Sequence, residues 1–270
     1  MSAPIETPLT AFTRNTGCSC KIAPQVLEQI IKPGSATEVF SQLLVGNESL
    51  DDAAVMDLGD GTALISTTDF FTPIVDEPFE FGRIAAANAI SDVYAMGGKP
   101  ILALAILGWP IDKLPAELAA QVIEGARAVC KEAGIPLAGG HSIDSTDPIF
   151  GLSVNGRVPI DRIKKNSGGQ IGDWLFLTKP IGSGILSTAR KRGLLQPEHN
   201  EPLLNTMGSL NKIGAELGAM TGVHALTDVT GFGLLGHLGR MALESAVSVA
   251  IEFAAVPFLP GAVDLAMDGV

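Results

Sequence analysis

The chain has 270 residues, a length that suits one large domain or two modest ones. Its net charge is −11, from 18 Lys and Arg against 29 Asp and Glu, which argues against a nucleic-acid-binding face. Three cysteines, two of them near neighbours, do not make a disulfide framework, so a reducing cytoplasm is expected. The longest apolar run, 101–109, is too short to span a bilayer.

The first half of the sequence alternates strand and helix patterns. Two strand-like runs, 53–58 and 62–67, flank Gly59-Asp60-Gly61, which is typical of a hairpin turn. Helical spacing over 81–96 ends at Gly97-Gly98. The further predicted elements are a strand at 101–107, a helix at 115–133, and strands at 136–138 and 150–158. This order predicts an α+β layer with helices on one face of a sheet.

A glycine-rich joint at 166–172 predicts a domain boundary. Beyond it we expect strands at 174–178, 224–229 and 247–253, and helices at 185–192, 203–220 and 234–244. The predicted organisation is a mobile N-terminal segment (1–48), a first domain (49–165) and a second α/β domain (166–270). The second domain is expected to be incomplete, because the sequence stops in a segment that bears Pro and Gly.

Two cysteines and a lysine lie together in Gly17-Cys18-Ser19-Cys20-Lys21. The neighbouring cation favours the thiolate, so this loop predicts reactive chemistry with soft or anionic species. The alternative is a pair of ordinary surface thiols or a labile disulfide. Cys130, in contrast, falls on the apolar face of a predicted helix and is expected in the core.

Several aspartates stand at the ends of predicted strands or on a predicted helix. Asp51-Asp52 opens one strand and Asp69 follows another, whereas Asp92 shares a helix face with Asn88. Asp228 ends a strand of the second half. Each alone is typical of a cap or turn. Together they favour a site for a hard cation such as Mg²⁺, which commonly accompanies nucleotide phosphates.

Two glycine motifs have backbone suited to phosphates. Gly139-Gly140-His141-Ser142 follows a short apolar strand and is either a phosphate or ribose contact or a capped turn. The run 231–236 has the spacing of a dinucleotide fingerprint. Only one βαβ unit fits after it, and Asp228 would lie beside a pyrophosphate. We therefore interpret Gly231 and Gly233 as turn residues and Gly236 as a helix-packing residue.

Seven blocks of sequence run in order from residue 17 to 233. They are Gly17-Cys18-Ser19-Cys20-Lys21, Val45-Gly46-Asn47-Glu48 with Asp51-Asp52-Ala53-Ala54-Val55, Ser66-Thr67-Thr68-Asp69-Phe70-Phe71, Asn88-Ala89-Ile90-Ser91-Asp92, Met96-Gly97-Gly98-Lys99-Pro100, Gly139-Gly140-His141-Ser142-Ile143 and Thr227-Asp228-Val229-Thr230-Gly231-Phe232-Gly233. Together these blocks resemble the selenophosphate synthetases. The second and fourth blocks recur more loosely in aminoimidazole ribonucleotide synthetases, hydrogenase-maturation dehydratases and thiamine-monophosphate kinases. The Cys-x-Cys-Lys loop distinguishes the selenium family.

This resemblance implies an α+β fold of two domains and a homodimer whose N-terminal domains share a barrel. It implies that ATP, selenide and water give selenophosphate, AMP and orthophosphate. The residues matching the family's functional positions are, for catalysis, Cys18 and Lys21; for Mg²⁺, Asp52, Asp92 and Asp228; and for ATP, Lys21, Ser49, Leu50, Asp51, Asp69, Asp92, Gly140, His141 and Ser142.

The sequence departs from the family in one respect, because a further Asp-Pro-Gln-Thr-Ser-Gly-Gly stretch is absent. Two alternatives therefore stay open. One is another ATP-dependent synthetase or kinase of the same superfamily, and the other is an inactive truncated module for dimerisation or nucleotide binding.

Overall fold

The computed structural model describes residues 8–13, 26, 30, 40–47 and 50–270. Its described part contains a mixed six-stranded sheet with the strand order β1-β2-β3-β6-β4-β5. All neighbouring strands are antiparallel except the parallel pair β4 and β5. The strands are β1 (Leu43–Val45), β2 (Ala54–Asp57), β3 (Thr62–Phe71), β4 (Lys99–Trp109), β5 (Leu137–Asp144) and β6 (Ile149–Pro159).

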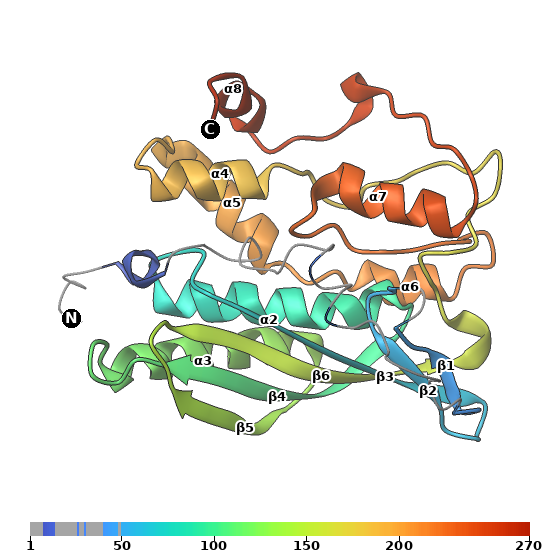
Figure 1. The fold of residues 1–270 in the computed structure, drawn as a ribbon, viewed down its shortest axis with the longest axis horizontal. Coiled ribbons are helices and arrows are strands. Elements are labelled where there is room, and N and C mark those ends of the chain that lie inside the picture. The colour runs from blue at the N-terminus through green and yellow to red at the C-terminus, as the bar shows by residue number, and fades with distance from the viewer. Residues whose placement is uncertain (1–7, 14–25, 27–29, 31–39, 48–49) are drawn as a thin grey trace.

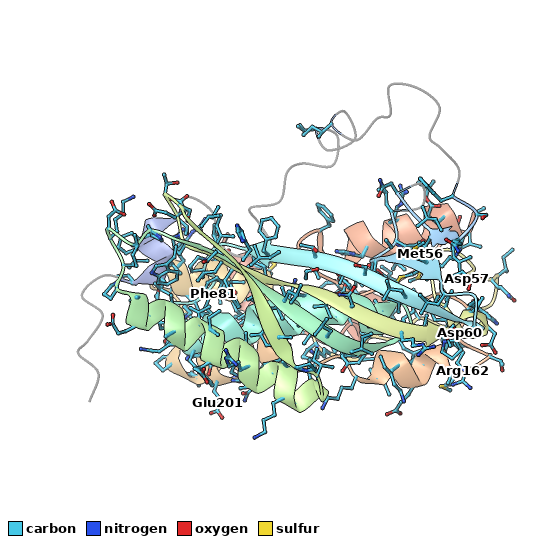
Figure 2. All side chains as sticks on the ribbon, turned by 90° about the horizontal axis from the view of Figure 1, so that it is seen from below. Met56, Asp57, Asp60, Phe81, Arg162 and Glu201 are labelled. Atoms are coloured by element: carbon cyan, nitrogen blue, oxygen red, sulfur yellow. The ribbon has the colours of Figure 1, made fainter. Side chains whose placement is uncertain are left out.

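The predicted hairpin between β2 and β3 is confirmed. Gly59 and Gly61 have φ angles of 76° and 82°, which glycine adopts without strain. The carboxylate of Asp57 accepts a hydrogen bond from the Gly59 amide at 2.8 Å, and that of Asp60 accepts one from the Thr62 amide at 3.0 Å. Figure 2 shows Asp57 and Asp60 together at one end of the sheet.

Helices α2 (Pro78–Ala95) and α3 (Ala116–Ala133) complete the first half, in the predicted order of elements. Two glycines let them pack closely. A Cβ atom on Gly82 would lie 1.9 Å from the backbone oxygen of Val122, and one on Gly125 would lie 2.0 Å from that of Phe79. Any larger residue at either position would push the two helices apart.

The second half is helical in the described residues. It comprises α4 (Ser183–Lys191), α5 (Pro197–Gly208), α6 (Ile213–Gly218), α7 (Gly233–Glu244) and α8 (Ala262–Met267), with the short 3₁₀ turn η4 (Phe253–Ala255) before α8. Two further 3₁₀ turns, η1 (Leu9–Phe12) and η3 (Ile160–Arg162), lie in the first half. Figure 1 shows α2 as a middle layer between the sheet and these helices. Within the described part, no helix is both long and apolar enough to cross a membrane.

The three strands predicted for the second half are wrong. Segments 174–178, 224–229 and 247–253 carry no strand, and the Ile181–Phe258 bridge is isolated. A strand exists only where a neighbour pairs with its backbone, and apolar alternation alone cannot supply that partner. Trp174 and Phe176 are accordingly each 85% exposed.

Two further boundaries differ from the prediction. The helix expected over 203–220 is two helices, because the chain breaks at Ser209 and lets the Asn211 side chain donate a hydrogen bond to the Ser91 hydroxyl at 2.8 Å. The strand expected over 136–138 continues as β5 to Asp144, because β4 pairs with it along that length.

Two apolar cores hold these layers together. The larger lies between the sheet, α2 and α3, where the Phe81 ring packs against Phe71 and Phe150 with centroids 6.0 and 6.2 Å apart. Cys130 is 1% exposed in this core, as predicted. A smaller core joins α4, α5 and α8 through Leu186, Leu203, Leu259 and Ala262.

Candidate active site

Strand β3 and helix α2 bring two polar pairs together. The buried residues Ala63, Ile65 and Phe71 alternate along β3, so Thr67 and Asp69 point to the same side, toward α2. The Thr67 hydroxyl donates to the Asp92 carboxylate at 2.5 Å. One turn earlier on α2, the Asn88 amide donates to the Asp69 carboxylate at 2.6 Å. Each carboxylate is thereby held by a partner from the other element.

The second half contributes to the same place. The Thr227 hydroxyl donates to the Asp52 carboxylate at 3.0 Å, across the two halves of the chain. Asp228 follows directly and is close enough to act on Asp92 electrostatically. The four aspartates predicted from the sequence to act together therefore do lie near one another.

The surroundings of Asp92 disfavour its charged form. Burial raises the pKa of Asp92 well above its usual value, and the negative charge of Asp228 adds to that rise. Asp52 and Asp69 contribute in the same direction, whereas the hydrogen bond from Thr67 lowers the pKa. Repulsion of this kind favours either a bound proton or a bound cation.

The donor set fits a hard cation, since Mg²⁺ prefers carboxylate oxygens. Among the described residues, no three His, Cys, Asp or Glu side chains already stand together as a metal-binding group. The aspartates are thus near neighbours coupled by charge, rather than a closed set of ligands. The assignment of Asp52, Asp92 and Asp228 as ligands of such an ion stays a prediction.

The loop before β2 is fixed by a residue that we did not predict for the site. The Asn166 backbone amide donates to the Asp51 carboxylate at 2.7 Å, and its side-chain amide donates to the Leu50 carbonyl at 3.1 Å. Leu50 has a φ angle of 48°, a left-handed conformation uncommon outside glycine. The sequence marked Asn166 only as the start of the joint.

The segment 139–142 is part of β5, so of its two interpretations the capped turn is wrong. Gly140 is required there, because a Cβ atom would lie 2.1 Å from the Ala105 carbonyl oxygen of β4. His141 and Ser142 are exposed at the sheet edge. With β6 and β4 between them, β5 and β3 lie about 14 Å apart at the usual strand spacing. The fold of one chain therefore separates Gly140, His141 and Ser142 from Asp69.

The run 231–236 forms the turn into α7. Gly233 has a φ angle of 70° and begins the helix, in keeping with our interpretation of a turn glycine. Because 224–229 is not a strand in the described residues, the βαβ unit of a dinucleotide fold is not formed here. Three predicted site residues, Cys18, Lys21 and Ser49, lie outside the described residues, as does most of the N-terminal segment 1–48 that we expect to be mobile.

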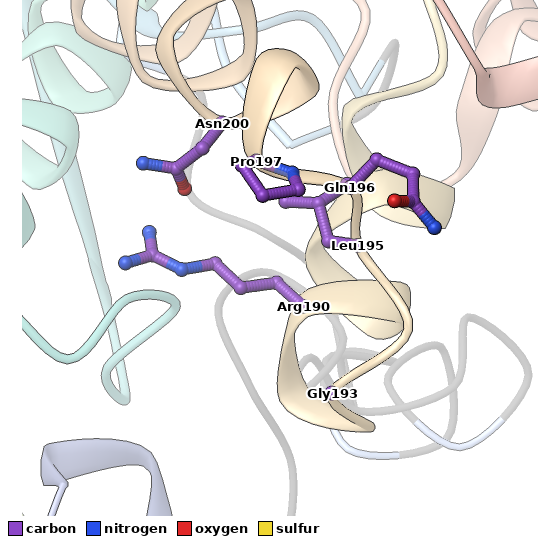
Figure 3. A pocket seen from close by; sticks show the side chains of 6 residues that line it. All are labelled: Arg190, Gly193, Leu195, Gln196, Pro197 and Asn200. Carbon is purple, nitrogen blue, oxygen red and sulfur yellow. The ribbon is translucent and has the colours of Figure 1, made fainter.

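A separate pocket of about 350 Å³ lies between α4 and α5, away from the aspartates. Figure 3 shows the side chains of Arg190 and Asn200 extending toward the same space. The Arg190 guanidinium also donates to both carboxylate oxygens of Glu77 at 2.6 Å. This pair ties α4 to the start of α2.

Both halves of the chain match known protein families. Residues 50–158 match the family described as AIR synthase related protein, N-terminal domain, and residues 170–267 match its C-terminal domain. A selenide, water dikinase from Photorhabdus laumondii is 60% identical over 255 residues, which are 94% of this chain and 74% of that protein. The chain belongs to the selenide, water dikinase family.

Solved structures agree with this fold. The structure described as AaThiL complexed with AMPPCP and TMP superposes with a TM-score of 0.72 at 18% identity, over 91% of this chain and 76% of the other. Hydrogenase maturation protein HypE in complex with ATP gives a TM-score of 0.66 at 21% identity, over 82% and 67%. The chain thus has the AIR synthase-like fold with N- and C-terminal domains that its sequence predicts.

Proposed function

We propose that the chain catalyses ATP-dependent synthesis of selenophosphate from selenide and water, with release of AMP and orthophosphate. The family to which it belongs supports this activity. The observation that carries it is a group of four aspartates, in which Asp52, Asp69 and Asp228 surround Asp92. The first half of the chain supplies three of them and the second half supplies Asp228. Because carboxylates and phosphates repel each other, this group can bind a polyphosphate only together with cations.

The proposed roles follow from chemistry and contacts. Asp52, Asp92 and Asp228 hold Mg²⁺, which when bound neutralises phosphate charge and stabilises phosphoryl transfer. Asn88 orients Asp69 toward the nucleotide, and Thr67 orients Asp92. For Lys21 we propose a cation beside the phosphates, and for Cys18 a soft nucleophile that holds or delivers selenium.

We propose a homodimer in the cytoplasm, with 49–165 and 166–270 as its two domains. Among the described residues, strands β3 and β4 expose Phe70, Ile101 and Leu104, and apolar surface of this kind favours association. The edge strand β5 is exposed as well. Contact of one nucleotide with both Asp69 and the 140–142 segment would draw on two copies of the chain. Light scattering at micromolar concentration is expected to give a dimer, and a monomer alone contradicts this proposal.

An assay of nucleotide products tests the reaction itself. We expect AMP and orthophosphate to form from Mg·ATP only when selenide is present. AMP released without selenide, or ADP as the sole product, would instead support another synthetase or kinase of the superfamily. Nucleotide binding without any turnover would support an inactive binding module.

A further inference from the structure

Asn166 is buried where the two halves of the chain meet, with 4% of its surface exposed. Its main-chain and side-chain groups contact different elements. The backbone amide donates to Asp51, the side-chain amide donates to the carbonyl of Leu50, and the backbone carbonyl accepts from the Ser245 hydroxyl at 3.3 Å. The Ser245 hydroxyl in turn accepts from the Gly169 amide at 3.0 Å. Residue 166 therefore links the loop before β2 to the end of α7.

The contact with Leu50 has a specific consequence. Leu50 is one of two non-glycine residues with positive φ in the described part of the chain, and a branched side chain makes that conformation costly. The surrounding structure has to hold such a residue in place. The Asn166 side-chain amide does so by binding the Leu50 carbonyl, two residues before Asp52.

We propose that Asn166 is a positioning residue that sets the 50–52 loop so that Asp52 faces Thr227 and the other carboxylates. This inference rests on the proposed function, in which Asp52 is a metal ligand. Asn166 acts on Asp52 through the backbone carbonyl of Leu50. Without the Asn166 side chain, we expect the 50–52 loop to leave its strained conformation. The affinity of the site for Mg²⁺ and nucleotide should then fall, although every proposed ligand is still present.

The substitution Asn166→Ala isolates the side chain, because the backbone amide that binds Asp51 stays. Asn166→Ser is the second variant. It keeps a polar group in the buried space, but its hydroxyl is one bond shorter and does not reach the Leu50 carbonyl. Ser245→Ala is the matched control, because it breaks the same network on the side away from Leu50.

Two measurements report on the 50–52 loop and do not depend on catalytic activity. The first is hydrogen–deuterium exchange of the peptide that contains residues 50–53. The second is the dissociation constant of Mg²⁺ with the non-hydrolysable analogue AMPPCP, measured by calorimetry. In both Asn166 variants we expect faster exchange of that peptide and affinity about tenfold weaker, as for other residues that orient a metal ligand. Ser245→Ala is expected to lower the melting temperature while leaving both readouts at the wild-type value.

The outcomes separate this inference from the proposed function. Wild-type protein that makes no selenophosphate contradicts the function, whatever the variants do. Active wild-type protein with unchanged exchange and affinity in Asn166→Ser overturns the positioning role alone. Equal changes in Asn166→Ser and Ser245→Ala also overturn it, because they would reduce Asn166 to a general support of the interface. If Asn166→Ala fails to fold, Asn166→Ser carries the test.

Discussion

The Thr227 hydroxyl donates a hydrogen bond to Asp52 over 3.0 Å, although the two residues stand 175 positions apart in the chain. Asp52 precedes the first long hairpin, and Thr227 directly precedes Asp228 in the second half. One contact thus aligns two proposed metal ligands from opposite halves. The proposed site therefore draws on residues from both halves.

Thr227→Val is therefore expected to weaken Mg·ATP binding roughly tenfold, because valine keeps the shape but removes the donor to Asp52. Thr227→Ser, which keeps the hydroxyl, is the control and should bind like wild type. Calorimetric titration measures both variants. Equal affinities for the valine and serine variants would show that the hydroxyl has no positioning role.

Asp228→Asn and Asp52→Asn keep the side-chain size but remove one charge each. We expect much weaker Mg·ATP binding in both. The melting temperature of the metal-free Asp228→Asn protein should be unchanged or higher, because the charge of Asp228 raises the pKa of Asp92 and so opposes its ionisation. Thermal melts with and without Mg·ATP give both quantities. Unchanged nucleotide affinity would mark these aspartates as simple caps.

Cys130 gives a prediction for alkaline pH. Burial raises the pKa of its thiol from 9.0 to about 11, more than Arg127 lowers it. Below pH 9 the thiol is protonated in both the folded and the unfolded chain, so its contribution to stability is complete. Between pH 9 and 11 only the unfolded chain ionises, and the free energy of unfolding falls by up to about 1.4 kcal/mol per pH unit.

Urea denaturation of wild type and Cys130→Ala across pH 8–11 measures this difference. The alanine variant lacks the titrating group, so its stability should fall less steeply with pH. Parallel pH profiles for the two proteins would contradict the raised pKa.

The proposed loop chemistry separates Cys18 from Lys21. Cys18→Ser replaces a soft thiolate with a hydroxyl, so selenophosphate formation should fall steeply while ATP binding survives. Lys21→Ala removes a charge near the phosphates and should impair both, whereas Cys20→Ser should be mild. Product formation and nucleotide affinity are measured for each variant. Full selenide-dependent activity of Cys18→Ser would exclude its catalytic role.

Labelling with iodoacetamide tests the accessibility of Cys18 in the same loop. We expect rapid alkylation without ligand and protection by Mg·ATP. Cys130 serves as an internal reference, since its buried thiol should stay unlabelled in both states. A Cys18 that is inert with and without nucleotide would contradict the prediction.

Local pattern was sufficient to predict much of the first half. Glycines 59 and 61 marked the hairpin, and the apolar periodicity before Gly97 marked α2, because turn chemistry and burial act over a few residues. The same patterns at 174–178 predicted a strand wrongly, since pairing depends on a distant partner.

The proximity of the four aspartates was predictable from their residue type and placement, and their role in a site stays a prediction. Their orienting partners were not predictable. Thr227 and Asn166 act through contacts that span more than 100 residues, and neither residue type signals such a role in a loop. Asn88 was the exception, because it lies one helical turn before Asp92.

The middle position of α2 has a consequence for synthesis on the ribosome. The helix is apolar on most sides, and α5 and α6, which cover it opposite the sheet, begin about 100 residues after it ends. At ordinary elongation rates, synthesis of the residues between α2 and these two helices takes roughly 5–25 s. The nascent chain therefore exposes an apolar helix face for that interval, and we expect chaperones that act during translation to bind it.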